Sequence, residues 1–194
     1  TSFVAVGGDP DPHLQQYTAI LRNIDVLDQA AAGHGVFSVS PNFFDGIVRS
    51  SPVIVRVGDV RYPSLALEML RVGLGARSIN IKAAPDGIKD ILMRPKGTKE
   101  YYQVSTDRHA EVRAYYTPHS EYKANYIPAV DVINGTVDPA RLADKFVLVG
   151  TSAQGLLDLR SSPLDQVLPG VEVHANILEN VIFREGLNRP PEAE

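Results

Sequence analysis

The chain has 194 residues, which is the length of one ordinary domain. Apolar residues make up 44% of it, so a chain without a folded core is excluded. Its 19 basic and 23 acidic residues give a net charge of −4, without the basic excess of a nucleic-acid-binding protein. The absence of cysteine excludes thiol catalysis, thiolate metal sites and disulfides, and no apolar stretch approaches the roughly 20 residues of a membrane span.

The N-terminal third of the chain predicts short strands around one short helix. An apolar run at residues 3–6 is typical of a buried strand, and residues 36–39 and 47–57 have the composition of further strands. Between them, residues 25–32 predict a helix that begins at Asp25 and ends at a glycine.

Residues 63–74 give the clearest helix pattern of the chain. Apolar side chains cover most of its circumference, while Glu68 and Arg71 form one narrow polar stripe. Gly75 is a natural stop, because glycine readily adopts the left-handed conformation that follows a helix. We therefore expect this helix to pack on a sheet with most of its surface buried.

The second half of the chain predicts the centre of that sheet. Residues 79–81, 90–93 and 112–116 have strand patterns, and residues 171–183 predict a final helix. The strongest strand pattern is Phe-Val-Leu-Val at residues 146–149, which is apolar on both faces and therefore typical of a central strand. Together these elements predict a mixed α/β fold, with a central, mostly buried sheet flanked by helices, in a single domain that spans the whole chain.

One candidate for catalysis is a serine hydrolase. Ser152, Asp158 and His174 follow one another in the chain order of an α/β-hydrolase triad. The sharp turn that carries such a serine needs glycine two residues before and two residues after it. Gly150 meets this requirement and Gln154 does not, and the intervals between the three residues are too short for that fold. We therefore expect no catalytic residues, and keep a small hydrolase only as the alternative function.

A ligand pocket is the other candidate site. Ligands of open α/β sheets lie outside the carboxyl ends of the strands, which here means the loop after residue 150. The final helix must begin nearby, and its free N–H groups favour an anionic group. The polar side chains that would converge there are Thr151, Ser152, Asp158, Arg160 and His174. In the alternative interpretation these residues only fix the loop, with Asp158 paired to Arg160.

His174 is placed by helical spacing on the inward face of the final helix, together with Ile177, Leu178 and Val181. Its protonation would add a charge at the pocket, so a response to mildly acidic pH is a variant of the pocket hypothesis. We expect no metal and no cofactor, because the five histidines do not have zinc-motif spacing and the glycines after residue 149 lack the lysine of a phosphate loop.

Eight short motifs occur in an order that points to a known family. They are AGHGVF at residues 32–37, DGIVRSSP at 45–52, YPSLALE at 62–68, IPAVDVING at 127–135, KFVLVGTSA at 145–153, GLLD at 155–158, SPL at 162–164 and PGVEVHAN at 169–176. In this order and spacing the chain resembles the second type of CHASE domain, a sensing module of bacterial adenylate cyclases and histidine kinases. Ser162 replaces the threonine that is usual in the family and keeps its hydroxyl.

The resemblance implies a non-catalytic sensor domain outside the cytoplasmic membrane, with transmembrane helices around it and a cyclase or histidine kinase as the cytoplasmic output. The partners it implies are an unidentified small-molecule or protein signal and the membrane helices of the parent chain. A homodimer is compatible with it, and nucleic acid is not expected as a partner. The gene sequence on both sides of this segment would discriminate the sensor from the hydrolase, because only the sensor requires flanking membrane helices.

The resemblance extends from about residue 30 to residue 191. The first 29 residues match the family poorly, and the family has a further strand and helix before the region that matches. The chain also starts at Thr1 without methionine. We therefore expect this segment to be a piece of a longer protein that lacks the N-terminal part of its own domain.

Overall fold

The structure is a computed structural model that describes residues 1–39, 44–151, 158–184 and 187. Its largest sheet has four strands in the order β1-β6-β7-β8: β1 (Ser2–Gly7), β6 (Ser78–Ala84), β7 (Gly87–Met93) and β8 (Tyr102–Val104). The first strand runs parallel to β6, and the other pairs are antiparallel. Together with the helices, this mixed sheet confirms the predicted mixed α/β fold.

Three smaller sheets complete the strand pattern. They are β2 (Gln15–Tyr17), β4 (Ile54–Val57) and β5 (Val60–Pro63); β3 (Ser50–Pro52) with β9 (Glu111–Arg113); and β10 (Leu159–Arg160) with β11 (Leu168–Pro169). The hairpin between β4 and β5 turns at Gly58, whose φ of 59° lies in the left-handed region that favours glycine.

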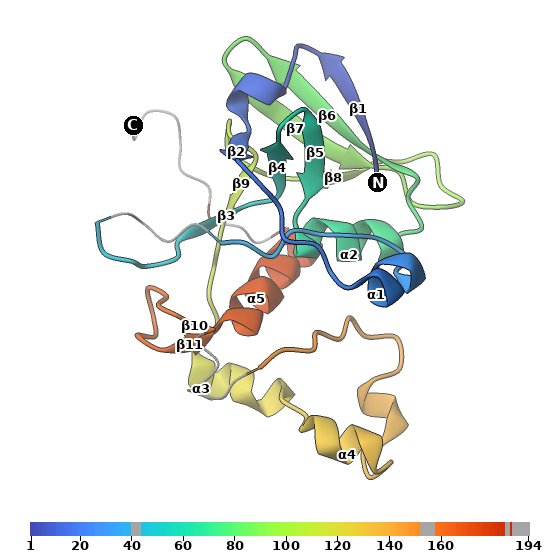
Figure 1. The fold of residues 1–194 in the computed structure, drawn as a ribbon, viewed down its shortest axis with the longest axis vertical. Helices are drawn as coiled ribbons and strands as arrows, with labels where there is room; N and C mark the ends of the chain where they lie inside the picture. The colour runs from blue at the N-terminus through green and yellow to red at the C-terminus, as the bar shows by residue number, and fades with distance from the viewer. Residues whose placement is uncertain (40–43, 152–157, 185–186, 188–194) are drawn as a thin grey trace.

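Two helices form the middle of the molecule, α2 (Leu65–Gly73) and α5 (Gly170–Phe183), and they pack on each other beneath the largest sheet (Figure 1). The hydroxyl of Ser64 caps α2 by accepting the N–H of Leu67 at 3.2 Å. Leu67 and Ile177 are among the fully buried side chains, and both belong to one core cluster with β6 and β7. The predicted helices at residues 63–74 and 171–183 are therefore confirmed.

The prediction for residues 146–149 is wrong. These residues form no strand, and Phe146, Val147 and Val149 are 42%, 50% and 91% exposed. The central positions of the largest sheet belong to β6 and β7, whose inward isoleucines are fully buried. An apolar run predicts that a segment can pair as a strand, but it does not say whether a partner strand lies beside it.

Two shorter predictions also need correction. The run at residues 3–6 belongs to β1, which is an edge strand exposed along most of its length, so it is not a buried strand. Residues 36–39 form only an isolated bridge, between Val36 and Ser64. The helix predicted at residues 25–32 is present as α1 (Asp25–Ala30), without a side-chain cap.

Residues 118–150, which we call the arm, extend away from the core at the bottom of Figure 1. The arm contains α3 (His119–Tyr122), α4 (Ala129–Ile133) and two 3₁₀ turns, η2 (Lys123–Asn125) and η3 (Pro139–Arg141); a third, η1 (Asp11–His13), lies near the N-terminus. No residue of the arm is buried. Among the described residues, none of the helices has the length and apolar character to cross a membrane.

Candidate functional site

Asp158 lies against the start of α5. Its backbone oxygen accepts the N–H of Gly170 at 2.8 Å. Its carboxylate lies so close to Gly170 that an added Cβ would be 2.2 Å from Oδ1, so any other residue there would have to displace this carboxylate. The positive end of the helix therefore already has an anionic neighbour, supplied by the chain itself.

Arg160 lies beside this carboxylate. Its Nη2 is 3.4 Å from Oδ1 of Asp158, and its Nη1 donates to the backbone oxygen of Leu159 at 2.9 Å. Both charged side chains are more than a third exposed, so their ion pair contributes little to stability. A guanidinium has five N–H donors, so this loose pair leaves Arg160 able to bind a further acceptor.

His174 lies one turn into α5 and is 9% exposed. The ring of Phe37 meets it edge-on, with 6.3 Å between ring centroids. Burial lowers the pKa of His174; a hydrogen bond with the backbone of Phe37 and the charge of Asp158 oppose this shift, and Arg160 adds to it. His174 is therefore held as a neutral ring against the core, on the inward face that its spacing predicts.

Of the five predicted pocket residues, the structure brings three together: Asp158, Arg160 and His174. Thr151 is exposed, and the described contacts do not join it to these three. Ser152 lies outside the described residues. The pairing of Asp158 with Arg160 is the contact expected from the alternative, loop-fixing interpretation.

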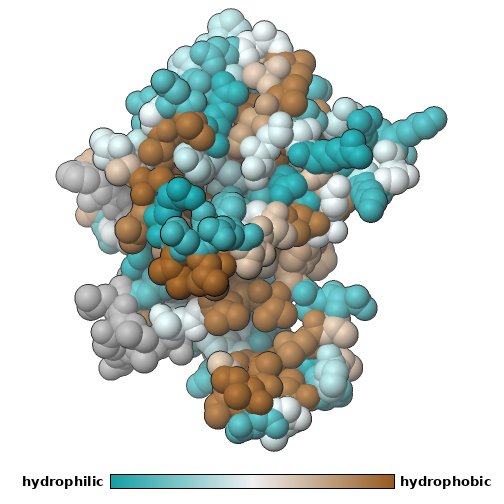
Figure 2. Space-filling view, turned by 45° about the vertical axis from the view of Figure 1, so that its right-hand side comes forward, coloured by the Kyte–Doolittle hydropathy of each residue, from teal (hydrophilic) through white to brown (hydrophobic). Residues whose placement is uncertain are grey.

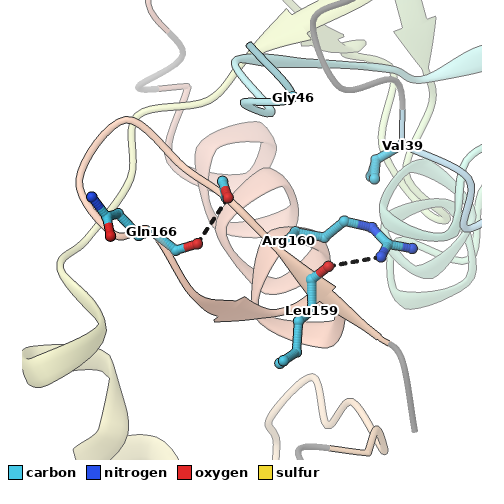
Figure 3. Close-up of a pocket in the computed structure, with 6 residues that line it drawn as sticks. Val39, Gly46, Leu159, Arg160 and Gln166 are labelled. Atoms are coloured by element: carbon cyan, nitrogen blue, oxygen red, sulfur yellow. Dashed lines mark hydrogen bonds between the residues drawn. The ribbon is translucent and has the colours of Figure 1, made fainter. Parts of the chain in front are cut away.

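A cavity of about 380 Å³ opens next to Arg160 (Figure 3). Its lining residues are Val39, Gly46, Leu159, Arg160, Ser161 and Gln166. The hydroxyl of Ser161 donates to the backbone oxygen of Gln166 at 2.8 Å, and the backbone oxygen of Ser161 accepts the N–H of Val48 at 2.8 Å. These bonds hold one wall in place and leave Arg160 as the charged lining group. His174 does not line the cavity.

A second cavity, of about 330 Å³, lies along α2 and is mostly apolar. Gly33 and Gly73 are among its lining residues, and a Cβ on Gly33 would meet the carboxylate of Glu68. That carboxylate is buried and fully paired, since it accepts hydrogen bonds from Arg71 and from the hydroxyl of Thr1. This cavity therefore offers a ligand mainly apolar contacts. Both carboxylate oxygens of Glu68 are already paired within the chain.

Polar residues on α5 that the sequence analysis did not single out form a second cluster. Glu172, Asn176 and Asn180 are all buried and follow one another at intervals of four residues, so they share one helix face. Polar side chains at this spacing within an apolar helix are the sequence signal that could have revealed them.

Asn180 binds the extended segment that leads to the arm. Its Oδ1 accepts the N–H of Tyr115 at 2.6 Å, and its Nδ2 donates to the backbone oxygen of the same residue at 3.0 Å. One turn earlier, Asn176 accepts the N–H of Thr117 at 2.9 Å and donates to the backbone oxygen of Glu172 at 2.8 Å. The two side-chain amides thus make the hydrogen bonds to the backbone of this segment that a neighbouring strand would otherwise make.

Glu172 joins α5 to the arm. Its Oε2 accepts the hydroxyl of Tyr126 at 2.6 Å and lies 2.7 Å from Nδ1 of His119, while among the described residues its buried Oε1 has no partner. Burial and the Glu172 carboxylate raise the pKa of Tyr126. Within the described part of the chain, no three histidine or carboxylate side chains are placed to hold a metal ion.

The model of one protein family, the CHASE2 domain, matches residues 4–194. The chain belongs to the CHASE2 family. CHASE2 domains are extracellular, non-catalytic sensor domains found in cyclases and histidine kinases. The match begins at residue 4, within β1, so it extends further toward the N-terminus than the resemblance seen in the motifs, which begins at about residue 30. Searches of curated proteins and of solved structures gave no match for this chain.

Proposed function

We propose that this CHASE2 domain is the signal-input module of a bacterial transmembrane receptor, positioned outside the cytoplasmic membrane. Family membership over residues 4–194 is the observation that carries the proposal. In it, the receptor's membrane helices connect the domain to a cytoplasmic adenylate or guanylate cyclase or to a histidine kinase.

The cavity beside Arg160 is the place we propose for the signal. It combines an apolar wall with one guanidinium that has donors to spare, which suits a small organic molecule with an acceptor group. Arg160 lies beside Asp158 and acts electrostatically on His174, which belongs to the first part of α5. A ligand that moves Arg160 would therefore change the contacts at the start of that helix.

No observation favours the alternative hydrolase. The carboxylate of Asp158 lies against Gly170 and beside Arg160, and His174 is enclosed next to Phe37. A triad needs its histidine between the carboxylate and an accessible serine, with free ring nitrogens facing both.

A reporter fusion tests the location. In the complete gene, a reporter enzyme that is active only after export is fused directly after residue 194, and a reporter active only in the cytoplasm is fused at the same point. We expect activity from the exported reporter, because the proposal puts this domain across the membrane from the output domain. Activity from the cytoplasmic reporter alone would reject the proposal.

A further inference from the structure

Basic side chains gather at one end of the largest sheet. Ile79 pairs with Met93 and Met93 pairs with Tyr102, so β6 begins, β7 ends and β8 begins at this end. The end of α5 also lies there, because the guanidinium of Arg184 is 4.7 Å from the centroid of the Tyr102 ring. The exposed basic residues at this end, which we call the basic face, are Arg77, Arg94, Lys96, Lys99 and Arg184. The loop of residues 94–101 lies at the right of Figure 1, and Figure 2 shows hydrophilic side chains projecting on the same side of the molecule.

The loop that carries three of these cations is held against the core. The backbone N–H of Lys96 donates to the backbone oxygen of Leu74, at the end of α2, at 2.9 Å. The guanidinium of Arg94 lies 5.8 Å from the centroid of the Tyr101 ring. A contact with a ring face leaves the N–H donors of a guanidinium available, so Arg94 can still bind an acceptor. The loop therefore presents its basic side chains to solvent from a fixed position.

The charge of the basic face is not neutralised by the chain. Within the described residues, no carboxylate forms an ion pair with any of its five side chains, and the loop contains one acidic residue, Glu100, against three basic ones. The opposite end of the same sheet differs. There, Nζ of Lys82 is 3.3 Å from Asp90, and Nζ of Lys89 is 2.6 Å from Asp86. Since the whole chain carries −4, the unpaired positive charge is a local feature that attracts an anionic partner.

Two observations favour a membrane surface over an acidic protein as this partner. Tyr101 is 49% exposed beside Arg94, and tyrosine is enriched at the membrane–water interface, where its ring and its hydroxyl both find suitable surroundings. Ser2 pairs with Ser78, so a segment that leads into β1 reaches the domain at the basic face. In the proposed function such a segment comes from the membrane, which would place lipid phosphates next to these cations.

We propose that the basic face binds anionic phospholipid headgroups at the membrane surface. The inference rests on the proposed function, because a receptor joined to membrane helices keeps the domain near lipid. Phosphate oxygens accept hydrogen bonds from the arginines and attract the lysines as point charges. Each basic residue close to an anionic membrane adds a modest attraction, and the tether raises the effective concentration of lipid, so a few residues are enough. The contact orients the domain with this end of the sheet toward the membrane.

Co-sedimentation of the purified chain with lipid vesicles tests the proposal. We expect binding to vesicles that contain phosphatidylglycerol and none to vesicles of phosphatidylcholine alone, which carry no net charge. The double variant Lys96→Gln with Lys99→Gln should bind at least about tenfold more weakly, because each basic residue near the surface contributes about fivefold to the affinity. Raising the salt from about 0.1 M to about 1 M should abolish binding, because the screening length falls from about 10 Å to about 3 Å.

The matched control removes two positive charges at the opposite end of the sheet. Lys82→Gln with Lys89→Gln changes lysines that are already paired, and should leave vesicle binding unchanged. Equal weakening by the two double variants, or no binding to phosphatidylglycerol, would overturn the proposal. So would binding to polyglutamate without binding to vesicles, which would identify an acidic protein as the partner. The reporter fusion is independent of these results, so an exported domain that does not bind anionic vesicles would contradict this inference alone.

Discussion

Replacing Asn180 with leucine should lower the free energy of unfolding by about 2–4 kcal/mol, because it removes both hydrogen bonds to the backbone of Tyr115. Leucine is close to asparagine in size and suits an apolar helix, so the loss would come from polar groups left without partners. Urea unfolding followed by circular dichroism measures it. The effect should be larger than for most single substitutions.

Asn23→Leu is the matched control for that experiment. Asn23 is exposed, so the same change of side chain should move the free energy of unfolding by no more than about 0.5 kcal/mol. Equal losses of stability at the two positions would mean that the side-chain amide of Asn180 does not hold the segment before the arm.

The stability of the domain should also depend on pH through His174. Burial lowers the pKa of this side chain in the folded state, so the unfolded chain, with an ordinary pKa near 6.5, binds the proton more tightly. The stability that the neutral ring contributes is present above pH 6.5 and is lost as the pH falls through the lowered folded-state value. The loss from this one group is at most about 1.4 kcal/mol per pH unit.

Unfolding at pH 7.5 and at pH 5.5 measures this dependence. His174→Gln keeps a polar side chain beside Phe37 and cannot titrate, so its stability should fall less across this range than that of the unmodified chain. His109→Gln makes the same exchange at an exposed histidine and serves as the control. If all three proteins lose the same stability, the burial of His174 has no role in acid sensitivity.

The sequence predicts most clearly the helices whose hydrogen bonds and end signals lie within one short segment of the chain. The pattern of residues 63–74 predicts α2 because its apolar face and its glycine stop are both local features. The pattern of residues 146–149 is equally clear, yet a strand also needs a neighbour, and pairing between distant segments is not written in any short run. β1 shows the same limit, since its apolar residues lie on an exposed edge.

The candidate site was partly predictable for the same reason. Helical spacing placed His174 on the inward face of α5, and the proximity of Asp158 and Arg160 follows from their two-residue interval. The cavity is lined in part by Val39 and Gly46, which lie more than a hundred residues earlier in the chain than its other lining residues, so only the fold could reveal it. Glu172, Asn176 and Asn180 were missed because their partners, from Tyr115 to Tyr126, lie 46 to 65 residues earlier in the sequence.

The output activity of the complete receptor tests the signal-input role most directly. Val39→Trp fills the cavity beside Arg160, and Val60→Trp places the same side chain on the exposed β5 hairpin. If the cavity receives the signal, Val39→Trp should change cyclase or kinase output in the native cells by at least about fivefold, the lower end of typical allosteric coupling, while Val60→Trp leaves it unchanged. Output that stays the same in Val39→Trp, and also after removal of residues 4–194, would contradict the account.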